Sequence, residues 1–293
     1  MKIKKKERVT IFDIFLYILF GVLAVLTIYP FYNVVIISFS NTIASATYSP
    51  YLLPYVIDLT AYKTILMDSA FVSALTTTLF VTIVGTTLNM TFSVVAAYVL
   101  SKKELLGRNF MLTAILFTML FSGGMIPSYL VIKDLGLVNN IWVMILPSLI
   151  NTYYLIIMKN YFASLPVSLA EAARIDGANE FVILIKIYLP VSAPFMATFS
   201  LFYMVERWNE WWLAFIYIND QAIKPLQIYL REILVSFNSQ LSTQAQSMLM
   251  GQKVFVQSIQ MAAIIVTMLP IVCVYPFVQK YFVKGIMIGS IKE

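Results

Sequence analysis

The sequence predicts an all-α integral membrane protein with about six transmembrane helices and both termini in the cytoplasm. Three observations support this prediction. First, the 293 residues are 60% hydrophobic and only 12% charged, with a mean hydropathy of +0.85, whereas soluble domains carry roughly 25% charged residues. Second, the apolar residues form six segments that each reach the roughly 20 residues needed to span a bilayer. Third, Lys and Arg are unevenly divided between the two sides.

The six segments are expected to be helical because lipid cannot satisfy backbone polar groups, and the sequence shows no short alternating strands of a membrane barrel. The basic residues 1–8 precede an apolar run that is too long for a signal peptide and has no small-residue cleavage site, so we expect an uncleaved first helix. In the third segment, Gly123 and Gly124 followed by Pro127 predict a break or a close-packing point. The predicted helices cover about 11–38, 70–100, 109–132, 141–163, 193–218 and 254–279.

The connecting loops set the orientation. Fourteen Lys and Arg residues fall on the side of the termini and five on the other side, which places the 164–192 loop in the cytoplasm and the 39–69 and 219–253 loops outside. The net charge of +6 mostly reflects this bias and does not indicate nucleic-acid binding. With no internal repeat or soluble segment, residues 1–293 form a single transmembrane domain. Residues 226–237 can form a short amphipathic helix in the last outer loop.

The 164–192 loop has the pattern of a helix, a turn and a second helix. Ser168 and Glu171 have the spacing of a capping box, and Gly177 is placed to end the first helix with a left-handed residue. Asn179 can cap the second helix. A structured loop of this length, with several alanines that permit close approach, predicts a docking surface for another protein. An amphipathic loop lying on the membrane surface is the alternative.

This loop resembles the EAA motif of bacterial ABC importer permeases. Three residues separate Ala173 from Gly177, and nine separate Gly177 from Ile187, which is the spacing of that motif. The Asp176-Gly177-Ala178 variant is similar to that of the MalG-like carbohydrate-uptake permeases. The stretch 225–231 looks like an LplC-like and alginate-type polysaccharide subgroup. The residues that carry the resemblance or would couple to an ATPase are Glu171, Ala172, Ala173, Arg174, Asp176, Gly177, Ala178, Ile187, Leu189 and Pro190.

The resemblance implies a type I ABC importer permease in a bacterial plasma membrane, with the loop forming a coupling helix seated in a cytoplasmic ATPase. It implies a second homologous permease subunit, two ATPase subunits, an extracytoplasmic solute-binding protein and a carbohydrate substrate. ATP and Mg would bind to the partner ATPase. The sequence agrees, because it contains no G-x-x-x-x-G-K-[ST] phosphate loop, and we expect no cofactor on this chain.

Ionisable residues inside a membrane span are costly and mark function by default. In the fifth helix, Glu206 and Glu210 are one helical turn apart, and Trp208 and Trp212 share the same spacing. Arg207 is expected to pair with a carboxylate on a neighbouring helix. Aromatic rings, amides and carboxylates suit a sugar path. An interfacial tryptophan belt and a structural charge network are the alternatives.

Polar residues in two other helices either line a wet cavity or hydrogen-bond between helices. One group is the patch 151–154 in the fourth helix, and the other is a pair of glutamines three residues apart in the sixth. The complete set of candidates for the substrate path is Asn151, Tyr154, Glu206, Trp208, Asn209, Glu210, Trp212, Gln257 and Gln260.

Three other functions remain open. An ABC importer for a non-sugar solute would share the loop. A self-sufficient secondary carrier would more often show an internal repeat. A membrane-embedded enzyme would need clustered catalytic groups, but the chain has no histidine and only the Glu206/Glu210 pair. We therefore expect neither catalytic residues nor a metal site.

Overall fold

The computed structural model describes residues 10–40, 53, 56–240 and 256–274, and its regular elements within these ranges are helices. The chain divides into two compact units, which are described separately. Unit 1 contains Met1–Asp68 and Glu232–Thr267, and unit 2 contains Ser69–Arg231 and Met268–Glu293. Three helices in the described residues are long and apolar enough to cross a membrane, and up to six if each bent pair counts as one span.

Unit 1 is built on α1 (Ile11–Ser38), which coincides with the first predicted helix. A capping box begins α1, because the Thr10 hydroxyl accepts from the Asp13 backbone while the Asp13 carboxylate accepts from the Thr10 backbone. A short helix that the sequence did not predict, α3 (Thr60–Leu66), lies in the 39–69 loop. The last helix runs over Val256–Val274, and the outer ends of its predicted range lie outside the described residues.

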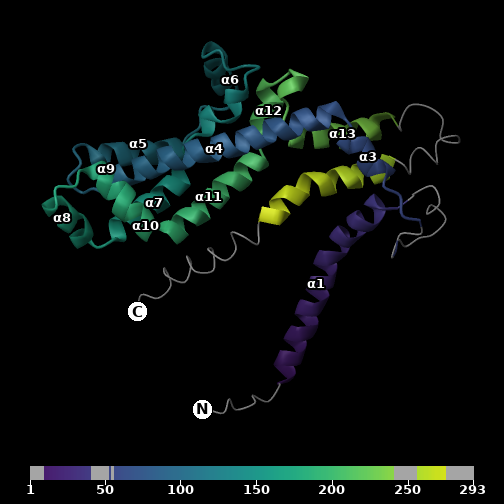
Figure 1. Cartoon of the computed structure of the whole chain (residues 1–293), viewed down its shortest axis with the longest axis horizontal. Coiled ribbons are helices and arrows are strands. Elements are labelled where there is room, and N and C mark those ends of the chain that lie inside the picture. Colours follow the sequence, from purple (N-terminus) through teal and green to yellow (C-terminus); the bar gives the residue numbers. More distant parts are fainter. Residues whose placement is uncertain (1–9, 41–52, 54–55, 241–255, 275–293) are drawn as a thin grey trace. The chain divides into compact units, whose positions relative to one another are not determined.

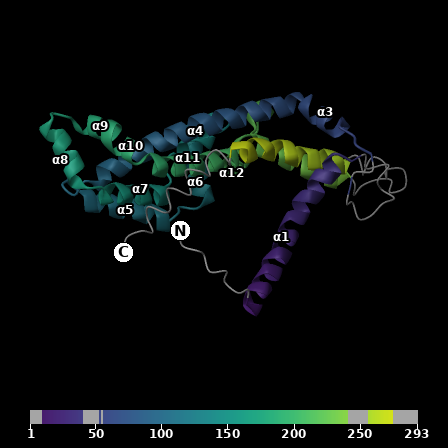
Figure 2. The ribbon, with the colours of Figure 1, turned by 60° about the horizontal axis from the view of Figure 1, so that its bottom comes forward.

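Unit 2 is organised around α4 (Ser69–Ser101), which covers the second predicted helix. At 1.5 Å per residue its 33 residues extend about 50 Å. The helices α7 (Thr152–Ser164) and α11 (Ala193–Trp208) both pack along it, as Figures 1 and 2 show. Side chains of all three helices form the buried core of this unit.

The third predicted helix is not one straight span. It divides into α5 (Arg108–Leu120) and α6 (Met125–Asp134), which are bent by 116°. The predicted break is where the sequence placed it, and Gly124 has a φ of +87° that favours glycine. The predicted segment over 109–132 is therefore two helices, and the predicted break within it is confirmed.

Two more predicted helices are broken. The fourth begins as two 3-10 turns, Ile141–Met144 and Leu146–Ser148, and continues as α7 after a bend of 47°. The fifth ends its first part at Trp208 and resumes as α12 (Trp212–Tyr217). In both cases the continuous helix was wrong. The predicted outer helix at 226–237 is present as α13 (Leu226–Gln240).

The 164–192 segment contains α8 (Val167–Ile175) and α9 (Glu180–Ile183), then a π-helical turn and α10 (Leu189–Val191). Gly177 has a φ of +81° and Asn179 caps α9 by accepting from the Val182 backbone at 2.9 Å, as predicted. The capping box was wrong, because α8 already begins after Pro166 and Ser168 lies inside its first turn.

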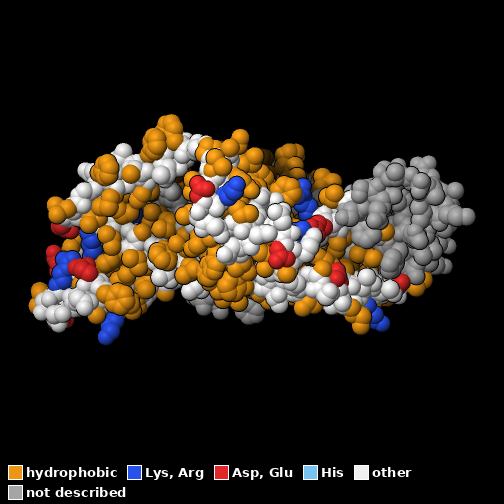
Figure 3. Space-filling view, turned by 90° about the horizontal axis from the view of Figure 1, so that it is seen from above, with side chains coloured by type: hydrophobic (Ala, Val, Ile, Leu, Met, Phe, Trp, Pro, Cys, Tyr) orange, Lys and Arg blue, Asp and Glu red, His pale blue; other side chains and the backbone are white. Residues whose placement is uncertain are grey.

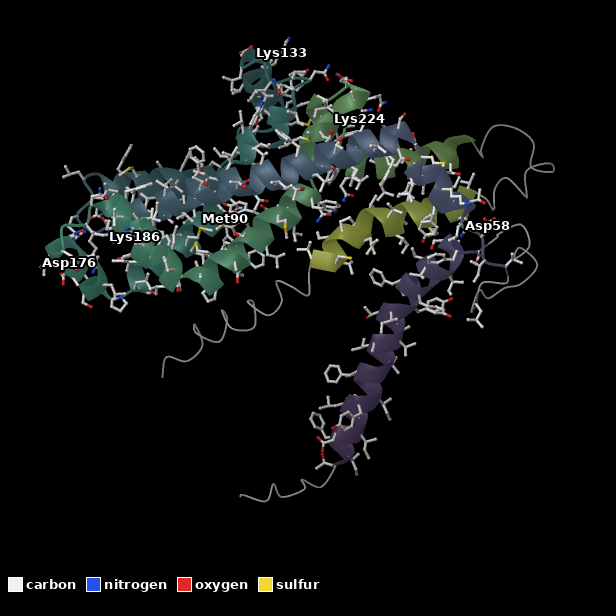
Figure 4. All side chains as sticks on the ribbon, in the orientation of Figure 1. Asp58, Met90, Lys133, Asp176, Lys186 and Lys224 are labelled. Atoms are coloured by element: carbon white, nitrogen blue, oxygen red, sulfur yellow. The ribbon has the colours of Figure 1, made fainter. Side chains whose placement is uncertain are left out.

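Hydrophobic side chains dominate the surface of unit 2 in Figure 3, and one group of charged side chains lies at the end that carries α8. In Figure 4, Asp176 and Lys186 lie near this end and Lys224 lies toward the other, with Met90 between them. A largely apolar surface is the pattern expected of helices in lipid.

Candidate functional site

A cavity of about 320 Å³ opens where the break before α7 meets the end of α11. It brings together five of the nine candidates for the substrate path: Asn151, Glu206, Asn209, Glu210 and Trp212. Its wall is formed where the fourth and fifth predicted helices are interrupted, so polar side chains and non-helical backbone both line it.

The end of α11 differs from the sequence prediction. The helix stops at Trp208, so Glu210 lies in the linker and its carboxylate accepts from the Leu213 backbone at 2.9 Å at the start of α12. The two carboxylates therefore do not share a face of one helix, and neither do the two tryptophans. Trp208 is buried at 5% exposure, whereas Trp212 is 50% exposed. Of these two rings, only Trp212 lines the cavity.

Glu206 is the exposed carboxylate of the cavity. One of its oxygens accepts from the Asn151 amide at 3.3 Å and from the Tyr154 hydroxyl at 3.2 Å. Asn151 also begins α7, because its side-chain oxygen accepts from the backbone of the two residues that follow Thr152. The sequence predicted a polar patch at 151–154, and the structure places two of its residues, Asn151 and Tyr154, against Glu206 of the fifth predicted helix. Carboxylate, amide and phenol can all hydrogen-bond to a ligand hydroxyl.

Aromatic rings stand beside these polar groups. Trp211 and Trp212 meet edge to face, with ring centroids 5.4 Å apart. Trp211 also contacts Phe215, over which the Arg231 guanidinium lies at 4.1 Å from the ring centroid. Rigid aromatic surfaces beside hydrogen-bonding groups suit a ligand that has both apolar faces and hydroxyls.

Within the described residues, Arg207 forms no ion pair with a carboxylate of a neighbouring helix, contrary to the prediction. It is 3% exposed, and its guanidinium donates to the side-chain oxygen of Asn89 at 3.0 Å, to the Ser148 carbonyl at 2.6 Å and to the Met144 carbonyl. All three partners are neutral. Two of them are carbonyls of the segment before α7, so Arg207 satisfies backbone groups that the helix break leaves without helical partners. Gly85 makes room for it, since a Cβ there would lie 2.9 Å from Arg207 Cδ.

Three more residues that the sequence analysis did not select complete this frame. Asn89 donates to the Ser148 and Leu149 carbonyls at 2.9 and 2.7 Å. The Tyr203 hydroxyl lies 2.7 Å from Ser93 Oγ and accepts from the Asn151 backbone at 3.1 Å. These bonds replace the helical bonds that the break removes, which is the condition for non-helical backbone in a membrane.

A sequence signal for this frame exists. Gly85, Asn89 and Ser93 are spaced by four residues, so they form one stripe of small and polar residues along α4. Tyr203 and Arg207 have the same spacing on α11. The two stripes together would have indicated a polar contact between the second and fifth helices. We refer to these five residues as the Arg207 frame.

The two glutamine candidates belong to unit 1. Gln260 donates to the Leu234 carbonyl at 3.3 Å, which fits a hydrogen bond between helices. Gln257 is half-buried in the same helix. The cavity described above is formed by unit 2 alone.

The predicted coupling loop has a buried side and an open side. Ala170 and Ala173 of α8 are buried in the core of unit 2, whereas Val167 and Ile175 are 63% and 86% exposed. The coupling candidates that are exposed here are Glu171, Ala172, Arg174 and Asp176. Beyond the turn formed by Gly177 and Ala178, the partly buried Ile187 and Leu189 pack against the same core, and Pro190 lies in the first turn of α10.

Glu180 is the functional candidate that the sequence analysis missed in this loop. It accepts from Arg174 Nη2 at 2.7 Å and Nε at 2.9 Å, and from the Tyr98 hydroxyl at 2.5 Å. The Lys102 ammonium lies 3.2 Å from its second oxygen. One carboxylate therefore joins α8, α9 and the end of α4. We refer to these four residues as the Glu180 joint.

No group of three or more His, Cys, Asp or Glu side chains that could hold a metal ion occurs in the described part of the chain. The amides of Asn151 and Asn209 and the carboxylates of Glu206 and Glu210 line the cavity, and each of them already makes a hydrogen bond to a protein group. The geometry is that of a place where a ligand can hydrogen-bond.

Comparison with known proteins gives the same family along nearly the whole chain. Residues 80–288 match the family described as "Binding-protein-dependent transport system inner membrane component". The chain is 41% identical over 282 residues to the polygalacturonan/rhamnogalacturonan transport system permease protein YtcP of Bacillus subtilis, covering 96% of this chain and 98% of that protein. Protein LplC of the same organism is also 41% identical, over 96% of this chain and 95% of LplC.

A solved structure is similar in fold as well as in sequence. It is a bacterial ABC transporter involved in the import of the acidic polysaccharide alginate, and one of its chains is 35% identical with a TM-score of 0.84. The match covers 93% of this chain and 96% of that chain.

Proposed function

We propose that this chain, which belongs to the family of binding-protein-dependent transport system inner membrane components, is the permease subunit of an ABC importer for oligosaccharides or polysaccharide fragments. The observation that carries the proposal is the end-to-end similarity to a permease named for polygalacturonan and rhamnogalacturonan transport. The likeness to an alginate importer supports the same substrate class. As a membrane component of the import system, the chain would form part of the translocation path.

The partners follow from the family. A binding-protein-dependent system needs a solute-binding protein and an ATPase, and this chain has no phosphate loop of its own. We propose a complex of this subunit, a second homologous permease, two cytoplasmic ATPase subunits that bind ATP and Mg, and an extracytoplasmic binding protein. Transport would proceed by alternation between inward-open and outward-open states whose populations are shifted by ligands.

The cavity of unit 2 supports a polyhydroxylated substrate. Glu206, Asn151 and Asn209 offer hydrogen bonds to hydroxyl groups, and Trp212 offers an exposed ring. Arg207 donates to Asn89 and to the Ser148 carbonyl, so it fixes the backbone before α7 that forms part of the cavity wall. This arrangement allows a sugar to slide between polar contacts, as a translocation path requires.

The open side of α8 supports coupling to the ATPase. Glu171, Ile175 and Asp176 are exposed there, while the opposite side of the helix is buried in the core of unit 2. A short helix with one side in the permease and the other side open is a suitable element to receive a partner. The orientation expected from the Lys and Arg distribution would place it in the cytoplasm.

Co-purification followed by transport tests this proposal. The tagged subunit is isolated in mild detergent, its partners are identified by mass spectrometry, and the complex is placed in liposomes with its binding protein. We expect ATP-dependent uptake of labelled oligogalacturonides or neutral oligosaccharides, and loss of that uptake in the presence of vanadate. Uptake of amino acids or peptides alone would overturn the substrate class, and uptake by the lone subunit without ATP would indicate a secondary carrier.

A further inference from the structure

The end of unit 2 that carries α8 contains an ionic cluster that the proposed function does not use. We infer that Glu180 is a positioning residue that makes α8 and the end of α4 move as one body when the ATPase acts on α8. The inference rests on the proposed docking of the ATPase to α8. It assigns to Glu180 the transmission of that movement, and not the docking itself.

The corner between α8 and α9 is closed by backbone bonds. Gly177 adopts its left-handed conformation at the end of α8, and the Ala178 backbone donates to the Ala173 carbonyl at 2.9 Å. Arg174 then reaches across this corner to Glu180 through two nitrogens of its guanidinium. Two bonds from one planar group fix orientation as well as distance. The corner therefore holds α8 and α9 at a fixed angle.

The packing of α8 on the core is slight by comparison. Its buried contacts come from two alanines, Ala170 and Ala173, whose methyl groups remove little apolar area from water. The larger apolar residues Val167 and Ile175 point to the open side. A helix held by two methyl groups can slide or rotate when it is pulled, so its alignment with α4 must come from the polar joint.

The joint is anchored firmly at the α4 side. Tyr98 is buried and its ring meets Tyr188 edge to face at 5.0 Å and Phe162 at 6.3 Å. Lys102 lies over the Tyr98 ring at 4.2 Å while its ammonium pairs with Glu180. Tyr98 lies in the last turn of α4, and Lys102 follows directly after the helix ends at Ser101. Glu180 thus connects the loop to a helix end that cannot move independently of its neighbours.

The same α4 contributes three of the five residues of the Arg207 frame. Asn89 and Tyr98 are on one unbroken helix of unit 2, so a displacement of its end reaches the cavity without passing through a loop. A continuous helix is a stiff element, which makes it a suitable carrier of coupling between two sites. This gives a physical route from α8 to the polar wall of the cavity.

Distance measurement by electron paramagnetic resonance tests the joint. Spin labels are placed at the exposed positions Lys103 and Ile175 in a Cys273→Ser background, in the assembled importer, with and without ATP–vanadate trapping. In the wild-type joint we expect a narrow distance distribution that trapping leaves unchanged. In Glu180→Gln we expect a broader distribution that shifts on trapping. The coupling ratio of uptake to ATP hydrolysis should fall about threefold or more, with ATPase binding retained.

Two more variants keep the test decisive. Tyr98→Phe removes only the hydroxyl and keeps the ring packing, so it should broaden the distribution in the same direction. Lys186→Gln removes a nearby charge whose ammonium has no hydrogen bond or ion pair within the described residues, and it should match the wild type. A wild-type distribution in Glu180→Gln, or a wild-type distance that shifts on trapping, overturns the inference. Failure of the wild type to bind an ATPase would refute the docking proposal. The comparison of nucleotide-free distance distributions between wild type and Glu180→Gln would still test whether Glu180 fixes α8 relative to α4.

Discussion

The Arg207 frame and the Glu180 joint are both built around one ionised side chain, but they hold it in opposite surroundings. Arg207 is 3% exposed and its hydrogen-bond partners are neutral: one amide oxygen and two backbone carbonyls. The Glu180 side chain is 52% exposed and has two cations and a phenol around it. Each of them joins segments that are far apart in the sequence.

The difference shows that the number of contacts is a poor guide to energetic importance. Removing a buried donor leaves acceptors without water to replace it, at a cost of about 1–3 kcal/mol for each group. Removing one member of an exposed ion pair typically costs about 0–1 kcal/mol, because water solvates the remaining charge. We therefore expect the frame to determine whether the subunit folds and the joint to determine how it moves. Four predictions test this difference.

Arg207→Met should have the largest effect. Methionine fills much of the space but leaves the Met144 carbonyl and the Asn89 oxygen without their donor, and it removes one of the two donors to the Ser148 carbonyl. The subunit should therefore lose about 3 kcal/mol or more. The measurement is the melting temperature and the yield of folded subunit in detergent. Arg231→Met is the matched control, because that arginine is exposed on α13. A folded Arg207→Met subunit with the wild-type melting temperature would contradict the role of the frame.

Gly85→Ala should come next. The added Cβ would lie 2.9 Å from Arg207 Cδ, and the guanidinium cannot retreat because three bonds hold it, so overpacking should cost about 1–3 kcal/mol. The readout is again the melting temperature in detergent. Gly21→Ala in α1 is the control, since a Cβ there has nothing within 4 Å and alanine favours a helix. If both variants were equally stable, Arg207 would have to be less constrained than its bonds indicate.

Tyr203→Phe removes only the hydroxyl that Ser93 and the Asn151 backbone share. We expect a loss of about 1–2 kcal/mol, because the buried Ser93 hydroxyl and the partly buried Asn151 N–H both lose their partner. The ring packing is kept, so the subunit should fold and the start of α7 should loosen. Hydrogen–deuterium exchange of the 148–154 segment measures this directly, with Tyr17→Phe on the exposed side of α1 as control. Unchanged exchange in that segment would show that Tyr203 only fills space.

The two regions also differ in what the sequence could reveal. The turn at Gly177 and the cap at Asn179 depend on neighbouring residues, and local chemistry predicted both. The breaks before α7 and after α11 were missed because long apolar segments look continuous. What stabilises the first of them is a side chain 59 positions away in the sequence. Local patterns cannot show such a partner.

The same reason explains the residues that were not selected. Glu180 follows the cap of a short helix and has no unusual local signal, and its partner Tyr98 is 82 positions away. Arg207 was recognised as costly in a membrane, but its assumed carboxylate partner was wrong because open backbone carbonyls were not considered. The stripe of Gly85, Asn89 and Ser93 on the second helix was the sequence signal that could have indicated where Arg207 packs.

Glu180→Gln should have the smallest effect on stability and gives the sharpest contrast with Arg207→Met. Glutamine keeps the shape and can still accept from Tyr98, while water solvates the freed cations, so we expect a loss below about 1 kcal/mol. Because the Glu180 and Arg174 side chains are about half exposed, salt should weaken their ion pair, and the difference in melting temperature between wild type and variant should shrink as ionic strength rises. The experiment compares the two at low and high salt. A loss as large as that of Arg207→Met, or one insensitive to salt, would mean that the joint is shielded from water in the assembled importer and belongs with the frame as a folding element.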